Sequence, residues 1–366
     1  MSSLLQSIAL PLVFFAFSPH IVCQSNPYPH NAVSCVRCHS YPRMLGGSPM
    51  TVQREGSSVE GKFTPASEGG IHHRNGESAK SSASADQTTG TRVSLSLLGD
   101  GYIEAIKATD IKQNAHQEAN RGIEGLIVSA PALEASGSQP TLLVGRFGWK
   151  SQHSSLMSSC ADSLRNELGM RNRLYPDEYP THATTESPTP FDTPDAKTHK
   201  TELERLVDEI RHTSLPARDA SLAASLDAQE GENLFTQIGC AVCHVPTYKT
   251  LPPGRRINGG TYKVPKFLGN AVIHPYSDFL LHDVGTGDGI PQAAKPEYLE
   301  QSTANKFRSA PLWGLRFRQG LMHDGDSPGS EAAVKRHGGE ATTVRRQYEQ
   351  LTPTEKQHLQ QFLSSL

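Results

Sequence analysis

The chain has 366 residues, a formal net charge of -2 and a hydrophobic content of 36%, with 31 glycines and 25 prolines. This length suits two domains of ordinary size, and the near-neutral charge gives no electrostatic footprint for nucleic-acid binding. Four of the six cysteines fall in two short motifs, so no disulfide framework is indicated.

The chain opens with an apolar run over Leu4–Phe17, interrupted only by Gln6, Ser7 and Pro11. A run of this length is too short to span a membrane and is typical of the hydrophobic part of a signal peptide. We therefore expect residues 1–23 to be a signal peptide and the protein to be exported, to the periplasm of a bacterium. No other segment is long and apolar enough to predict a transmembrane helix.

Soon after the expected leader comes Cys35-Val36-Arg37-Cys38-His39, and the same C-x-x-C-H pattern returns in Cys240-Ala241-Val242-Cys243-His244. In c-type haem attachment the two thiols form thioethers with the haem and the adjoining histidine binds the iron. A thioredoxin-like site or half of a zinc site needs the two cysteines but leaves both histidines unexplained. The motifs predict two covalently bound haem c groups, with His39 and His244 as proximal iron ligands.

Two irregular stretches lie between the motifs. Gly56–Thr91 is rich in serine, glycine and charge, and we expect it to be a long loop. Tyr175–Thr198 contains five prolines and is expected to link two domains. We place an N-terminal haem c domain with loop-rich insertions at residues 24–200 and a C-terminal cytochrome c domain at residues 201–366. Cys160 is expected to be a small buried apolar residue.

The second half of the chain shows three helical patterns. Apolar residues recur at helical spacing in Thr201–His212, and a second stripe in Leu226–Ile238 leads directly into the second motif. A third helix is predicted from Thr352, with Pro353 at its first position and Glu355 completing a capping box. These patterns predict a mainly α protein with two cytochrome c-like domains and long irregular loops, whose haems face each other across the domain interface.

Six further segments resemble a known family in content and order. They are Gly101–Ile106, Gly145–Lys150 followed by Gln152, Pro275–Gly285, Phe307–Leu315, Met322–Gly325 and His337–Glu340. With the haem motifs they make the chain similar, from about Ser34 onward, to the di-haem oxidoreductase family, also labelled thiol oxidoreductases. That family is related to the bacterial di-haem cytochrome c peroxidases.

The resemblance implies the remaining iron ligands. In related peroxidases the electron-transfer haem takes a ligand from the helix after the segment that matches Met322–Gly325, which here indicates His337. Met322 is the alternative, and a methionine ligand would give a higher potential than a second histidine. For the first haem the resemblance indicates His72, with His73 beside it. Met44 and Met50 are closer to His39 in sequence and are alternatives. If no side chain binds the first iron, its open site would favour peroxide binding.

The resemblance also implies candidates for catalysis. Glu104 would move a proton at the substrate-binding haem, the alternative being a carboxylate in a salt bridge. Trp149 would lie between the haems and help electrons cross, the alternative being a core aromatic residue. Three arginines are candidates for pairing with haem propionates: Arg146, Arg308 and Arg316.

Together these features predict an exported di-haem c-type cytochrome oxidoreductase that is peroxidase-like and passes electrons from one haem to a substrate at the other. Its partner would be a small redox protein or a small-molecule electron donor or acceptor, without nucleic acid. The alternative is a non-catalytic di-haem electron-transfer protein. Thiol oxidation follows only from the family's second label.

Overall fold

A computed structural model of the chain describes residues 35–48, 50–60, 62–65, 71–73, 87–137, 140–168, 170–176 and 192–366. The expected signal peptide at residues 1–23 and most of the proline-rich stretch at 175–198 lie outside the described residues. Within the described part, none of the helices has both the length and the apolar character that a membrane span requires.

The expectation of a mainly α protein is wrong. About 36% of the described residues are helical and 17% are in strands or bridges. The largest sheet contains β1 (Thr51–Val59), β2 (Lys62–Pro65), β3 (Ile71–His73) and β4 (Gln87–Val93). All four overlap or border the stretch expected to be a loop, so that expectation is also wrong where the strands lie.

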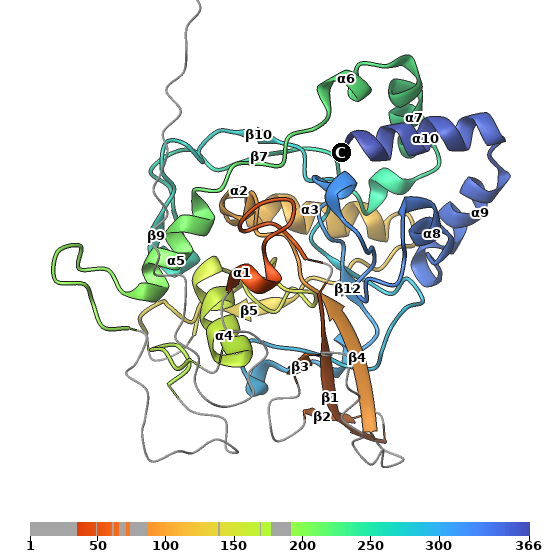
Figure 1. The fold of residues 1–366 in the computed structure, drawn as a ribbon. Coiled ribbons are helices and arrows are strands. Elements are labelled where there is room, and N and C mark those ends of the chain that lie inside the picture. The colour runs from red at the N-terminus through yellow and green to blue at the C-terminus, as the bar shows by residue number, and fades with distance from the viewer. Residues whose placement is uncertain are drawn as a thin grey trace, which may run out of the picture.

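Strand β1 is the centre of this sheet, and it pairs antiparallel with β2 and β3 along one edge and with β4 along the other (Figure 1). The register pairs Val52 with Arg92 of β4 and with His73 of β3. Threonine and valine are frequent in β1 and β4, and these β-branched residues favour strands. The low hydrophobicity of the segment concealed this preference in the sequence.

The described residues between 35 and 211 contain five helices: α1 (Cys35–Cys38), α2 (Asp100–Glu104), α3 (Ala108–Ala119), α4 (Leu156–Leu168) and α5 (Glu202–Arg211). Helices α4 and α5 pack against each other, and buried leucines of both belong to the largest hydrophobic cluster. The helix predicted over Thr201–His212 is confirmed as α5. Its capping box is formed by Thr201 and Glu204, which supply the hydrogen bonds that the first turn lacks.

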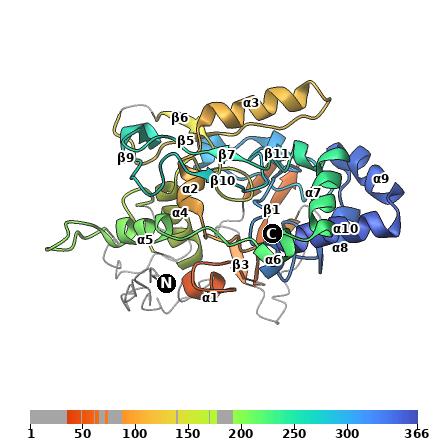
Figure 2. The same ribbon diagram turned by 90° about the horizontal axis from the view of Figure 1, so that it is seen from above.

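Helices of the C-terminal part gather on the opposite side of the molecule in both ribbon views (Figures 1 and 2). They are α6 (Ala220–Ala223), α7 (Leu226–Gln237), α8 (Ser330–Lys335), α9 (Thr342–Gln350) and α10 (Pro353–Ser365). The predicted helices leading into the second haem motif and closing the chain are confirmed as α7 and α10. Thr352 and Glu355 form the predicted capping box of α10.

Helices α7 and α10 pack against each other. Phe235 of α7 and Phe362 of α10 have ring centres 5.2 Å apart. Gly231 permits the approach, since a Cβ atom at that position would lie 2.1 Å from the backbone oxygen of His358. This pair supports the start of the second haem motif.

Short strand pairs and 3-10 helices stabilise the long connections. The pairs are β5 (Ser129–Pro131) with β6 (Leu142–Val144), β7 (Tyr248–Lys249) with β10 (Val272–Ile273), β8 (Arg256–Ile257) with β9 (Tyr262–Lys263), and β11 (Leu281–His282) with β12 (Phe307–Arg308). The 3-10 helices span Cys240–Val242, Asn258–Gly260, Pro296–Tyr298, Gln301–Thr303, Leu315–Phe317 and Gly339–Ala341.

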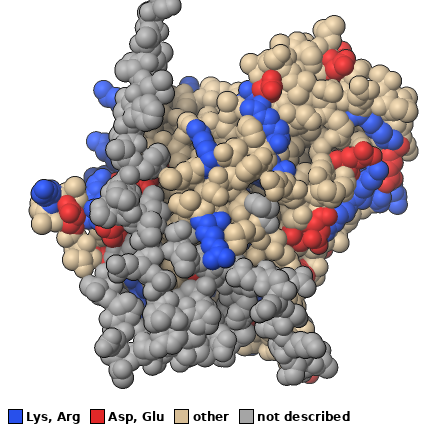
Figure 3. Space-filling view, in the orientation of Figure 1, with Lys and Arg blue, Asp and Glu red and all other residues tan. Residues whose placement is uncertain are grey.

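The larger hydrophobic cluster takes residues from both sides of the expected domain boundary at residue 200. It contains Leu164 and Leu203 together with Tyr248, Ile273 and Trp313. The domain limits remain a prediction. Among the described residues on the face shown in Figure 3, acidic and basic side chains are interspersed, as the small net charge suggests.

Candidate haem sites and the residues between them

The two C-x-x-C-H motifs border two different cavities. Cys35, Cys38 and His39 line the first, which encloses about 1240 Å³ of empty space that is partly open to solvent. Cys240, Cys243 and His244 line the second, of about 1360 Å³. Because each cysteine pair has its own cavity, the two pairs do not form one four-cysteine zinc site.

In the first motif, the chain turns at α1 so that the amide of His39 donates to the carbonyl of Cys35, at 2.9 Å. The side chain is held by a 3.2 Å hydrogen bond between Nδ1 and the backbone oxygen of Gly46. Burial lowers the pKa of His39, and its hydrogen bonds to backbone groups only partly oppose this. A neutral imidazole is the form that binds a metal.

The second motif has the same local arrangement. Helix α7 ends at Gln237, and Gly239 adopts a left-handed conformation with φ of 93° that turns the chain into the motif. Nδ1 of His244 lies 3.1 Å from the backbone oxygen of Tyr276, which leaves Nε2 for iron. Burial, with a smaller contribution from His337, lowers the pKa of His244 to about 4.

His337 lies opposite His244 across the second cavity. It follows α8, and its Nδ1 is 2.7 Å from the backbone oxygen of Ala333, which again leaves Nε2 for a metal. The ring centres of His244 and His337 are 6.5 Å apart. Two metal–imidazole bonds of about 2 Å, plus the distance from each nitrogen to its ring centre, sum to about 6 Å. The separation therefore fits one iron between two imidazoles.

Met322, the alternative ligand, also lines the second cavity. Its backbone has φ of 65°, and the side chain packs at the edge of the C-terminal hydrophobic cluster. Both predicted sixth ligands, His337 and Met322, thus line this cavity. Only the His337 ring lies at a distance from His244 that fits an iron between them.

The first cavity differs from the second. Among the described side chains, no other histidine ring pairs with His39, and neither Met44 nor Met50 is among the residues lining the cavity. The side chains of His72 and His73 lie outside the described residues, but β3 fixes their register. His73 pairs with Val52, which lines the cavity, and His72 pairs with Gln53, which does not.

Trp149 lines both cavities. Its indole nitrogen donates a 2.8 Å hydrogen bond to the backbone oxygen of Val93, which fixes the ring. On the side of the second cavity the ring makes edge contacts with Phe307 and His323, each with centres 6.4 Å apart. Those two rings are themselves stacked at 3.6 Å.

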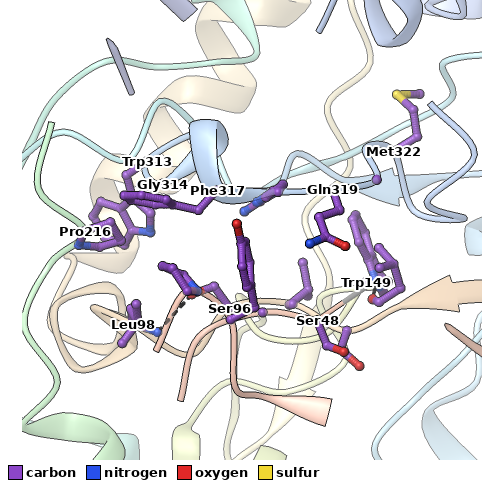
Figure 4. Close-up of a pocket in the computed structure, with 18 residues that line it drawn as sticks. Ser48, Ser96, Leu98, Trp149, Pro216, Trp313, Gly314, Phe317, Gln319 and Met322 are labelled. Carbon is purple, nitrogen blue, oxygen red and sulfur yellow. Dashed lines mark hydrogen bonds between the residues drawn. The ribbon is translucent and has the colours of Figure 1, made fainter. Parts of the chain in front are cut away.

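A third, smaller pocket adjoins the same tryptophan. It lies between the loop around Ser48 and the segment from Trp313 to Met322, and Trp149 and Met322 lie toward one end of it with Trp313 toward the other (Figure 4). The pocket has about 580 Å³ of empty space that is partly open to solvent. Trp149 is therefore common to all three spaces.

Arginines beside the cavities have the chemistry to hold haem propionates. Arg92 is buried at the first cavity, and its Nε and Nη2 find no hydrogen-bond partner among the described residues. Arg308 borders the second cavity, and its Nη1 is likewise without a partner in the described part of the chain. Buried guanidinium donors require acceptors, and carboxylates are the acceptors that guanidinium groups pair with best. The residues present fit two haem groups.

The other two predicted arginines lie elsewhere. Nη1 of Arg146 donates to the backbone oxygens of three residues of the Ile103–Ile106 turn. Arg316 donates to the backbone oxygen of Ala217. Arg92 was missed by the sequence reasoning, because its position beside the first cavity depends on the pairing of β1 with β4.

Glu104 is buried but lines neither haem cavity. Its carboxylate accepts hydrogen bonds from Arg211 at 2.7 Å and 3.1 Å, from Asn258 at 2.8 Å and from the amide of Leu156 at 2.9 Å. These contacts match the alternative given for Glu104 from the sequence, a carboxylate in a salt bridge. A fully occupied carboxylate outside both cavities gives no support to a catalytic role.

A buried acidic cluster beside the second motif was also missed. His282 lies between Asp278 and Glu340, with nitrogen–oxygen distances of 2.9 Å to each, and its Nδ1 is 4.0 Å from the sulfur of Cys243. Asp278 raises the pKa of His282 against the opposing effect of burial. Oε2 of Glu118 is 3.9 Å from the same ring. Burial and the charge of Asp278 raise the pKa of Glu118 to about 9.

Comparison with known proteins gives a family match. A family model described as "Di-haem oxidoreductase, putative peroxidase" matches residues 61–366, a range that includes the second haem motif and begins after the first. No curated protein sequence matches the chain. Among solved structures, a hydrazine synthase from Kuenenia stuttgartiensis, studied under xenon pressure, is similar at 18% identity with a TM-score of 0.33. The alignment covers 74% of this chain and 87% of that chain.

Proposed function

This chain belongs to the di-haem oxidoreductase family, and from that premise we propose that it is a peroxidase-like c-type cytochrome that reduces a peroxide at its first haem. Both haems would be covalently attached, through Cys35 and Cys38 and through Cys240 and Cys243. When bound, the two haems supply one-electron chemistry, one receiving electrons and the other delivering them to substrate.

One observation carries the division of roles between the sites. In the second cavity two neutral histidines lie at the separation of a six-coordinate iron, whereas in the first cavity no other described histidine ring is paired with His39. A six-coordinate haem exchanges electrons without binding substrate. A site with one permanent ligand leaves a position that peroxide can occupy. We therefore assign electron transfer to the second haem and peroxide binding to the first.

Trp149 supports the connection between the sites, because it lines both cavities and its ring is fixed by Val93. An aromatic ring between the haems shortens the gap that an electron must cross. We propose that Trp149 serves this transfer. His39 and His244 would hold the two irons, with their rings oriented by hydrogen bonds to backbone oxygens.

The same proposal includes export to the periplasm. It also includes an electron-donating partner, either a small redox protein or a small molecule. They are supported by the apolar N-terminal run and by the site of c-type haem attachment in bacteria. A non-catalytic carrier remains the rival, and it requires both irons to be six-coordinate with ligands that peroxide does not displace.

The test begins with the holoprotein. A pyridine haemochrome assay should give two haem c per chain, and low-temperature EPR should show one bis-histidine low-spin signal. Adding hydrogen peroxide should oxidise a reduced one-electron donor in repeated turnovers. Two low-spin signals that peroxide leaves unchanged, with no donor oxidation, would establish the carrier instead.

A tryptophan variant tests the connection. Trp149→Leu should slow the transfer of electrons from the reduced second haem to the first, followed by stopped-flow absorbance, while leaving haem content and both EPR signals in place. Trp313→Leu is the matched control, because Trp313 is buried at the small pocket but lines neither haem cavity. Equal transfer rates in the two variants would argue against a role for Trp149.

A further inference from the structure

The first cavity contains a second histidine that is unsuited to iron. His153 is 2% exposed and lines the cavity together with His39. Its Nδ1 is 2.9 Å from the hydroxyl of Ser158, and its Nε2 is 3.3 Å from Oδ2 of Asp162. Both ring nitrogens are therefore occupied. His244 and His337 differ, because each uses only Nδ1 in a bond to a backbone oxygen.

Asp162, the hydrogen-bond partner of His153, also lines the first cavity. It lies on α4, the helix that forms one wall of the first cavity, and its side chain is 16% exposed. Oδ1 accepts a 2.8 Å hydrogen bond from Asn166 one turn later. The carboxylate is thus held on both oxygens while it borders the cavity, as an acid–base group must be to meet a substrate in one orientation.

The backbone makes the pair rigid. The carbonyl of His153 accepts from the amides of Arg146 and Phe147, at 2.8 Å and 3.0 Å, and its own amide returns a bond to Phe147. Helix α4 begins only a few residues later, at Leu156. A histidine fixed in this way can orient a carboxylate but cannot swing toward an iron without breaking the bonds to Ser158 and Asp162.

We propose that Asp162 is the catalytic acid–base group of the first haem cavity, with His153 as the residue that orients it and shares its proton. This inference rests on the proposed peroxidase function. It adds the group that moves the proton, and it replaces Glu104, which lies outside both cavities and is occupied by Arg211. The substrate class is hydrogen peroxide or a small hydroperoxide.

The proposed step balances as follows. Asp162 would take the proton from one oxygen of hydrogen peroxide and return it to the other, which leaves as water when the O–O bond breaks. The haems would supply two electrons from an external one-electron donor, and solvent two protons, so that the first oxygen leaves as a second water. One peroxide, two electrons and two protons thus give two waters.

The test compares isosteric variants of the holoprotein in peroxide-dependent donor oxidation across a pH series. Asp162→Asn should lower the peroxide-dependent rate about 100-fold or more, with two haems per chain and unchanged EPR signals. Asp162→Glu keeps a carboxylate and should recover much of the rate. Glu209→Gln is the matched control, because Glu209 lies on the neighbouring helix α5 and lines neither cavity.

His153→Gln tests the orienting role. We expect a smaller loss of rate than in Asp162→Asn and a shift in the pH at which the rate is half its maximum. A purely structural residue would change haem content or thermal stability instead. If His153→Gln converts the first haem to a new spin state, His153 is an iron ligand and the proposal is overturned.

Other outcomes separate this proposal from the function on which it rests. If the unmodified protein turns over peroxide and Asp162→Asn retains its rate, the assignment of Asp162 is wrong while the peroxidase function stands. The same conclusion holds if the loss appears in Glu167→Gln, which removes the other carboxylate lining the cavity. If the unmodified protein has no peroxide turnover, the proposed function fails and the assignment of Asp162 fails with it.

Discussion

At the scale of single residues, the hydrogen bonds of the two ring nitrogens decide whether a histidine has a nitrogen left to bind a metal. His244 and His337 use Nδ1 for a backbone oxygen, which fixes the ring and leaves Nε2 for a metal. His153 uses both nitrogens and His282 is held between two carboxylates. Histidines that look alike in the sequence therefore separate into those with one bonded ring nitrogen and those with two.

Replacing His337 should change the second haem alone. We expect His337→Ala to abolish the bis-histidine low-spin EPR signal and produce a high-spin signal, with two haems still attached per chain. His337→Met should keep the iron low-spin and raise its potential, as methionine ligation does. The control is His358→Ala, since His358 lies outside both cavities and near Asp227. Unchanged EPR in His337→Ala would exclude it as a ligand.

Variants of the two adjacent histidines of β3 test the open position proposed for the first iron. The proposed function gives this iron one permanent ligand, His39, so neither His72 nor His73 should bind it. We expect His72→Ala and His73→Ala each to leave the EPR signal of the first haem unchanged. A changed signal in either variant would identify that histidine as a second ligand and contradict the open position.

At the scale of elements, local signals account for the helices. Thr201 with Glu204 and Thr352 with Glu355 form capping boxes that the neighbouring residues encode by themselves. The strands β1 to β4 were missed because their pairing is non-local and their composition is polar. Strand preference depends on the surface that the strand meets, so it is weaker evidence in a single sequence than a helix cap.

The crossing of α7 and α10 gives a prediction at this scale. A Cβ at Gly231 would lie 2.1 Å from the backbone oxygen of His358, so the helices must separate in Gly231→Ala. We expect a loss of about 1–3 kcal/mol in the free energy of unfolding, as for other overpacked contacts, measured by guanidinium denaturation followed by circular dichroism. Glu230→Ala, an exposed change in the same helix, should alter it by less than about 0.5 kcal/mol.

At the scale of the whole molecule, the buried acidic cluster links stability to pH. The pKa of Glu118 is raised from 4.5 to about 9, so the folded protein keeps its proton in a range where the unfolded chain has lost it. Within that range the unfolded state binds fewer protons, and stability falls as the pH rises. The neighbouring groups Asp278, His282 and Glu340 share this environment.

Glu118→Gln should therefore remove part of the pH dependence. The amide keeps the shape of a protonated carboxyl but cannot ionise. We expect the variant to become more stable relative to the unmodified protein as the pH rises from about 4.5 toward about 9, measured by denaturation at a series of pH values. Glu230→Gln, an exposed change, should leave the pH dependence unaltered. Parallel curves for Glu118→Gln and the unmodified protein would contradict the prediction.

The sequence by itself determined the family resemblance and the helices α5, α7 and α10, and it predicts the haem chemistry of the two motifs. Each of these is encoded by residues close together in the chain, such as the cysteines beside His39 or the cap formed by Thr352. Only the tertiary structure decided that the chain is not mainly α, that His337 faces His244, and that Trp149 borders both cavities. It also brought Arg92 to the first cavity and kept Glu104 out of it. These placements depend on contacts between distant segments, whose energies come from burial and pairing that no local pattern records.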